Sequence, residues 1–84
     1  MPSAPVGFYD DGSEILSWMY DGPNPTTWNI YTCAADGSGK IFHDSVAGNV
    51  FATDEDDLIY YVIQGVDGTG SPLTGFSNVV NAGN

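Results

Sequence analysis

The sequence predicts an all-β fold, a seven-stranded antiparallel β-sandwich, and three observations predict it. Apolar runs of about five to nine residues alternate with clusters of turn residues along the chain. The pair Asp-Gly occurs four times, beginning at residues 11, 21, 36 and 67, and such pairs tolerate the positive φ angles of tight turns. Apolar residues nowhere recur at the helical spacing over three turns.

The length predicts a single domain. We expect it to span residues 1–84, with an ordered part of about 4–80 and short frayed termini. A chain this short buries only about 60–65% of the surface that its unfolded state exposes. Two Trp, five Tyr and four Phe residues compensate, because each aromatic side chain buries a large area.

The strands follow from the apolar runs, and Pro2 and Pro5 before the first of them suit a strand at a sheet edge. The side-chain period of two places Leu16 and Trp18 on one face of the second strand. In chain order we expect strands at 6–9, 14–20, 27–34, 40–43, 49–52, 58–66 and 76–80. The predicted core consists of Leu16, Trp18, Trp28, Ile30, Ile59, Tyr61 and Ile63.

The strand at 58–66 is apolar on both of its faces. One face belongs to the core, and the other needs a cover, which is either a loop of this chain or another molecule. Both interpretations stay open. If the cover is another molecule, the candidates for an interface are Tyr31, Phe42, Tyr60 and Val62.

The charge is strongly acidic, with eleven Asp and Glu residues against the single cation of Lys40 and a net charge of -10. This charge repels nucleic acids and anionic lipids, so we expect neither as a partner. It also opposes self-association, although copies could still meet on a larger assembly. The acidic surface serves either solubility alone or docking onto a less acidic protein partner.

No apolar run approaches the roughly 20 residues that span a bilayer, and no signal-peptide pattern opens the chain. The start Met-Pro-Ser-Ala-Pro is typical of an intact beginning of translation. We therefore expect a protein that is made in a cytoplasm and is not exported by a recognisable signal.

The residues that catalysis uses are almost absent, so we predict a protein that is not an enzyme and has no cofactor. His43 is the only histidine and has no Ser or Cys beside it in a catalytic motif. Cys33 lies within an apolar strand without a basic neighbour to lower its pKa, which favours a small hydrophobic packing residue.

A weak candidate for a calcium site is the acidic run Asp54, Glu55, Asp56 and Asp57. Calcium takes six to eight oxygen ligands, usually from several segments. The run lacks the alternating spacing of a dedicated calcium loop, so a solvated acidic loop is the competing interpretation.

Several short motifs resemble those of fibronectin type III-like domains. Leu16-Ser17-Trp18 resembles the second strand of that family, and Trp28-Asn29-Ile30-Tyr31 resembles its third. The segment 61–67 resembles its sixth strand, and Gly70-Ser71 with Ser77-Asn78 resembles the turn and start of its last strand. The family commonly has a leucine six residues before the tyrosine of the sixth strand, where this chain has Glu55, so related immunoglobulin-like sandwiches stay open.

In type, a small acidic sandwich of this kind resembles the accessory proteins of bacteriophage virions. That resemblance implies a non-enzymatic decoration protein of the capsid head, located in the virion, which binds a major capsid or tail protein through its sandwich faces or tip loops. The alternative is a carbohydrate-binding or adhesion module of a phage tail or secreted protein, whose exposed aromatic residues stack on a glycan.

Overall fold

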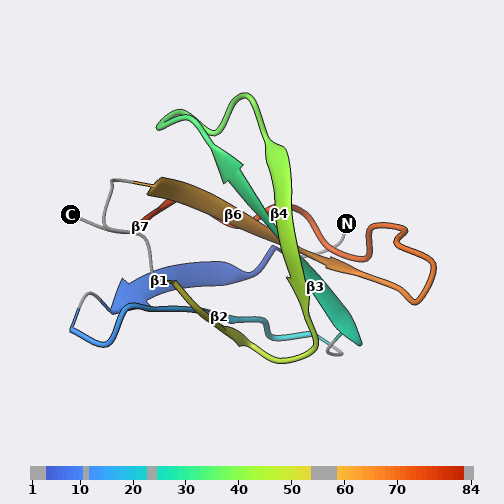
Figure 1. Cartoon of the computed structure of the whole chain (residues 1–84). Helices are drawn as coiled ribbons and strands as arrows, with labels where there is room; N and C mark the ends of the chain where they lie inside the picture. Colours follow the sequence, from blue (N-terminus) through green and yellow to red (C-terminus); the bar gives the residue numbers. More distant parts are fainter. Residues whose placement is uncertain (1–3, 11, 23–24, 54–58, 83–84) are drawn as a thin grey trace.

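The computed structural model describes residues 4–10, 12–22, 25–53 and 59–82, and in these ranges the chain forms seven strands in two antiparallel sheets (Figure 1). One sheet has the order β1-β2-β5 and the other the order β4-β3-β6-β7. The predicted all-β sandwich is confirmed. The strands are β1 (Val6–Asp10), β2 (Ile15–Met19), β3 (Thr27–Cys33), β4 (Ile41–Val46), β5 (Val50–Ala52), β6 (Ile59–Val66) and β7 (Val80–Ala82).

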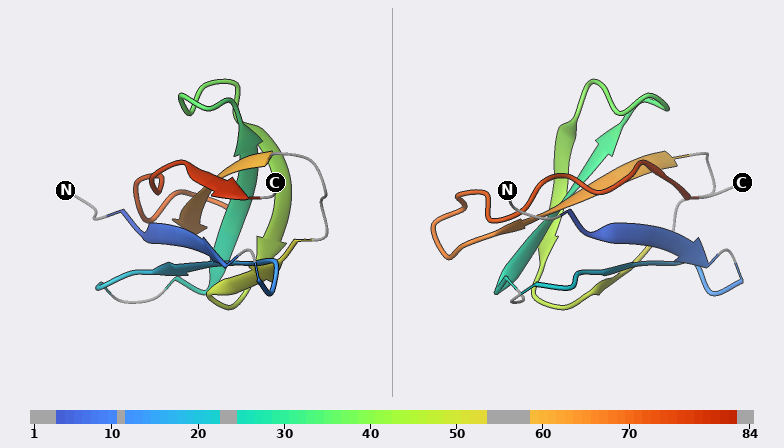
Figure 2. Two further views of the ribbon diagram at one scale, coloured as in Figure 1. Left: turned by 90° about the vertical axis from the view of Figure 1, so that its left-hand side faces the viewer. Right: turned by 180° about the vertical axis from the view of Figure 1, so that it is seen from behind.

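The core lies between the two sheets, which face each other in Figure 2. Alternate residues of β2 and β3 point inward, and the Trp18 and Trp28 rings meet edge to face with their centroids 5.9 Å apart. The side chain of Ile59, which the sequence also places in the core, lies outside the described part. The buried apolar cluster comprises Leu16, Trp18, Trp28, Ile30, Tyr61, Ile63, Val80 and Ala82.

The last strand is not where the sequence predicts it. The prediction of a strand at 76–80 is wrong, since β7 covers Val80–Ala82. Before β7 begins, Ser77 binds Ile63 of β6 with both its side chain and its backbone. The Ser77 hydroxyl oxygen accepts a hydrogen bond from the Ile63 N–H at 2.9 Å, and the Ser77 N–H donates to the Ile63 carbonyl oxygen at 2.8 Å. Asn81 and Ala82, which the sequence places in the terminal tail, pair with Tyr60 and Ile59 of β6.

Strand β4 is longer than the predicted strand at 40–43. It continues to Val46, which pairs with Trp28, and the register shifts between Ile30 and Tyr31 of β3. The extension contains exposed polar residues such as Asp44, which carry no alternating apolar signal. Pairing with β3 therefore extends this strand beyond what its own sequence indicates.

Asn78, in the segment that precedes β7, binds β1 through its side-chain amide. Its Nδ2 donates to the Gly7 carbonyl oxygen at 3.1 Å, and its Oδ1 accepts from the Gly7 N–H at 2.9 Å. The amide thus takes the place of a neighbouring strand along β1. The packing favours glycine at position 7, because a Cβ there would lie 2.8 Å from Cγ2 of Val80 and one of the two would have to shift.

Replacing Asn78 by alanine is expected to lower the free energy of unfolding by about 1–2 kcal/mol, because both polar groups of the buried Gly7 lose their partner. The control is Asn81→Ala, since Asn81 is exposed and its side chain makes no hydrogen bond within the described residues. Urea denaturation of both variants measures the difference. Equal stability of the two would contradict a role of the Asn78 amide.

Candidate interaction surfaces

The outer face of the four-stranded sheet holds the predicted interface residues. Tyr31 of β3 pairs with Phe42 of β4 and with Val62 of β6, so these three residues point to the same side of the sheet. Tyr60 lies two residues before Val62 and shares that side by the period of two. Of the four, Val62 is only 1% exposed, so it contributes packing and offers no contact surface.

Tyr31, Phe42 and Phe76 form what we call the aromatic cluster. The Tyr31 ring meets the Phe42 ring at 5.9 Å and 82°, and it meets the Phe76 ring at 5.5 Å and 75°. Edge-to-face pairs contribute about 0.5–1.5 kcal/mol each beyond area burial, so the three rings hold one another in place. Phe42 is nevertheless 56% exposed and Phe76 is 39% exposed. The cluster is a fixed apolar surface that faces solvent.

Phe76 was not among the predicted interface residues, although it is central to the cluster. It lies in the irregular segment between β6 and β7, where no alternation pattern specifies which way a side chain points. Its position depends on the contact with Tyr31, forty-five residues earlier in the chain (76 minus 31). No local sequence pattern therefore indicates the contact between Phe76 and Tyr31.

Lys40, the only Lys or Arg residue of the chain, is engaged within the molecule. Its Nζ donates to the Gly37 carbonyl oxygen at 2.6 Å and lies 4.9 Å from the centroid of the Phe76 ring. This cation–π contact holds the Lys40 side chain against the aromatic cluster. The sole side-chain cation of this acidic chain is thus already partnered.

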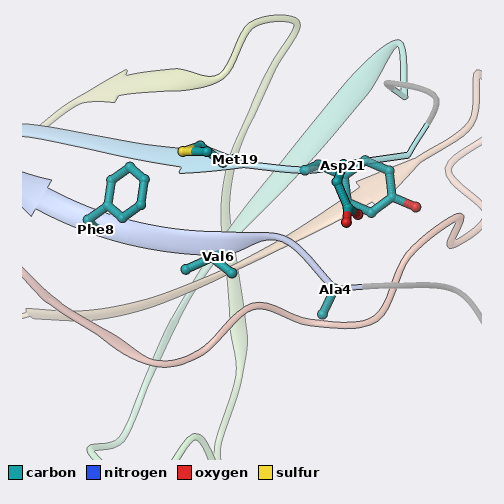
Figure 3. Close-up of a pocket in the computed structure, with 6 residues that line it drawn as sticks. Ala4, Val6, Phe8, Met19 and Asp21 are labelled. Carbon is teal, nitrogen blue, oxygen red and sulfur yellow. The ribbon is translucent and has the colours of Figure 1, made fainter.

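The outer face of the three-stranded sheet carries a second apolar surface (Figure 3). Val6 pairs with Met19 across β1 and β2, and Phe8 follows Val6 on the same face. These side chains are 56%, 66% and 44% exposed, respectively. They contribute to an open depression of about 420 Å³, which we call the apolar hollow. Its lining residues are Ala4, Val6, Phe8, Met19, Tyr20 and Asp21.

The prediction of interface residues missed the hollow, although the sequence contains a signal for it. Burial of Leu16 and Trp18 requires Met19 to point outward, and the strand pattern of β1 likewise turns Val6 and Phe8 to the outside. The strand pattern therefore indicates three outward-facing apolar residues on two neighbouring strands. Their convergence with Asp21 depends on the pairing of β1 with β2.

Three exposed carboxylates accept hydrogen bonds from residues of the turn in which each of them lies. Asp10, Asp36 and Asp67 each accept a hydrogen bond, at 2.8, 2.6 and 2.7 Å respectively, from a serine or threonine hydroxyl two or three residues later. These side-chain hydrogen bonds, with backbone N–H donors adding to them, lower the pKa of each carboxyl group. The ionised form of each residue therefore fixes a turn.

Asp21 differs from these three residues. Within the described ranges its carboxylate makes no hydrogen bond and no ion pair, and the same holds for Glu14. Figure 3 shows Asp21 toward one end of the hollow, with Phe8 and Met19 toward the other. The carboxylate of Asp21 therefore lies beside an apolar surface and has no hydrogen-bond donor among the described residues.

Of the two residues considered for catalysis, His43 is exposed and Cys33 is half-buried. The His43 ring lies 5.6 Å from the Phe51 ring and 5.7 Å from the Tyr61 ring. Burial raises the pKa of the Cys33 thiol, and its sulfur lies 3.8 Å from the Tyr60 carbonyl oxygen as a weak donor. Cys33 is therefore protonated at neutral pH and a poor nucleophile.

The acidic run Asp54, Glu55, Asp56 and Asp57, the weak candidate for calcium, lies outside the described residues. Among the residues that are described, no three His, Cys, Asp or Glu side chains gather in a way that could hold a metal ion. The same residues include no helix long and apolar enough to cross a membrane.

Comparison with known proteins assigns no family to this sandwich. No family model, no curated protein and no solved structure matches the chain.

Proposed function

We propose that this chain is a non-enzymatic attachment module that docks onto a larger protein assembly through the aromatic cluster. The observation that carries the proposal is the exposure of Phe42 and Phe76, which are 56% and 39% exposed while Tyr31 holds both rings edge to face. Aromatic anchors provide a large part of the binding energy of protein interfaces. Rings that are already fixed lose little conformational entropy on binding.

The assembly that we propose is the virion of a bacteriophage, with a major capsid or tail protein as the partner. The support is a resemblance of type, a small acidic sandwich with an exposed apolar face. Its net charge of -10 would face solvent and keep decorated particles apart. For the family we propose a fibronectin type III-like or related immunoglobulin-like sandwich, since sheets of three and four antiparallel strands are consistent with either.

The ring geometry favours a protein partner over a glycan. A sugar stacks on the flat face of an aromatic ring, whereas the Tyr31 ring stands at 82° to the Phe42 ring and at 75° to the Phe76 ring, so the three rings share no single plane. The carbohydrate-binding or adhesion module remains the alternative function. Quenching of tryptophan fluorescence is a poor test of it, because Trp18 and Trp28 are both buried in the core.

The proposal predicts that Phe42→Thr weakens attachment at least tenfold, the loss that follows when a central aromatic anchor is removed. The measurement is cosedimentation of the purified chain with particles assembled from the major capsid protein of its source. Threonine keeps the β-propensity of the exposed strand β4. The matched control is Val50→Thr, because Val50 is equally exposed on the opposite sheet and is expected to leave attachment unchanged.

Two outcomes would contradict the proposal. If the wild-type chain never sediments with particles, the assembly is wrong. If it sediments and Phe42→Thr binds as well as Val50→Thr, the aromatic cluster is not the attachment surface. Shifts of the Tyr31 and Phe42 ring resonances with a polysaccharide, in the absence of any particle binding, would favour the adhesion module.

A further inference from the structure

We infer that the apolar hollow on the three-stranded sheet is a binding site for an arginine side chain presented by another protein. This inference goes beyond the proposed function, because the hollow and the aromatic cluster lie on different sheets. It assigns the molecule a second contact surface, with a stated chemistry of the partner.

The lining of the hollow suits the aliphatic part of a long basic side chain. Val6, Phe8 and Met19 supply an exposed apolar floor on two paired strands. Lysine and arginine side chains bury their methylene stems along such surfaces while the charged end stays in water. Met19 can adapt to the stem, since methionine is unbranched and polarizable. The volume of about 420 Å³ falls within the range of about 300–1,000 Å³ that is typical of ligand sites.

The charge at one end of the hollow complements the charged end of that side chain. Asp21 lies at the end opposite Phe8 (Figure 3), and its carboxylate has no partner among the described residues. The carboxylates of Asp10, Asp36 and Asp67 are instead bound to their own turns. A guanidinium group can donate two parallel hydrogen bonds to a free carboxylate, and it also stacks on aromatic rings such as that of Tyr20, which lines the hollow and precedes Asp21 in the chain.

A second copy of this chain does not fit the hollow. The chain contains no arginine, and its one cation, Lys40, is held by the Gly37 carbonyl and the Phe76 ring. Two copies would also bring together two bodies with a charge of -10 each. The arginine therefore comes from a different molecule, and the charge of this chain attracts basic partners.

The test is an NMR titration of the full ¹⁵N-labelled chain with the peptide acetyl-Leu-Arg-Leu-amide. Saturable shifts are expected at the backbone amides around the hollow, at Val6, Phe8, Met19, Tyr20 and Asp21. The control peptide carries citrulline in place of arginine, which keeps the shape and removes the charge. We expect the citrulline peptide to bind about fivefold more weakly, because an exposed ion pair contributes roughly 1 kcal/mol to binding.

Two chain variants separate a specific contact from general attraction to an acidic protein. Asp21→Asn is expected to abolish the preference for arginine over citrulline. Glu14→Gln removes the same charge at the other end of β2, about 20 Å away at the rise of a strand, and is expected to retain the preference. Both residues are exposed, so the fold tolerates either change, and the amide spectrum of each variant checks this.

Met19→Ser provides a second, uncharged test, because it is expected to weaken the binding of both peptides by shortening the apolar floor. Two patterns of chemical-shift change overturn the inference: changes that spread over the acidic turns, and changes that centre on Tyr31 and Phe42. It is also overturned if Asp21→Asn and Glu14→Gln lose the preference for arginine over citrulline equally. Shifts at the hollow that depend on protein concentration without peptide would identify a second copy as the occupant, which also overturns it.

Discussion

Replacing Trp18 by alanine is expected to lower the free energy of unfolding by about 3–5 kcal/mol, the usual cost of truncating a large aromatic residue in a core. Trp18 is buried between the sheets, where its ring meets that of Trp28. The indole N–H of Trp18 has no hydrogen-bond acceptor among the described residues, so the cost comes from packing. Small domains have little stability to spare, and the variant is expected to be largely unfolded at 37 °C.

Met19→Ala is the matched control for Trp18→Ala, since Met19 is the next residue of β2 and points into solvent. A surface substitution of this kind changes stability by no more than about 0.5 kcal/mol. Thermal and urea denaturation followed by circular dichroism measure both variants. Should the two substitutions cost the same, the inward and outward faces of β2 would be assigned wrongly.

Gly65→Ala is expected to lower the free energy of unfolding by about 1–3 kcal/mol through overpacking. A Cβ at this buried position of β6 would clash with Cγ of Pro25 and would lie 3.0 Å from Cγ2 of Thr74. Pro25 is itself buried, and its ring cannot rotate away. Thr74 is fixed as well, because its hydroxyl oxygen accepts from the Gly65 N–H at 3.0 Å.

A double-mutant cycle isolates the contact between Gly65 and Pro25. Pro25→Ala removes the ring carbon that the new methyl group would meet, so Gly65→Ala is expected to cost less in that background. Gly68→Ala is the control, because a Cβ there has no neighbour within 4 Å. Additive effects of the two substitutions would show that the cost at Gly65 has another origin, such as the backbone of β6.

The sequence predicted correctly that several residues share the outer face of the four-stranded sheet. The apolar outer side of the strand at 58–66 directed attention to Tyr31, Phe42 and Tyr60, and these side chains lie on one face of the four-stranded sheet. It did not distinguish Val62, which lies on the same face and is buried. Which of several outward-facing residues becomes covered depends on segments that are distant in the chain.

Local sequence patterns alone specify the all-β class, the approximate position of most strands and the inward face of β2 and β3. Alternation of apolar and polar residues is a local property, and a strand that buries one face must follow it at every second residue. The same local rule places Leu16, Trp18, Trp28 and Ile30 in the core.

The position of the last strand and the composition of the exposed surfaces depend instead on tertiary contacts. Ser77 and Asn78 bind β6 and β1 through their side chains, so the ladder of β7 begins only at Val80. The Phe76 ring contacts the Tyr31 ring, and Asp21 lines the hollow together with residues of β1. In both cases the segments that meet are not adjacent in sequence, and neither sequence indicates the other as its neighbour. Such contacts arise from the packing of whole sheets, and no local periodicity encodes them.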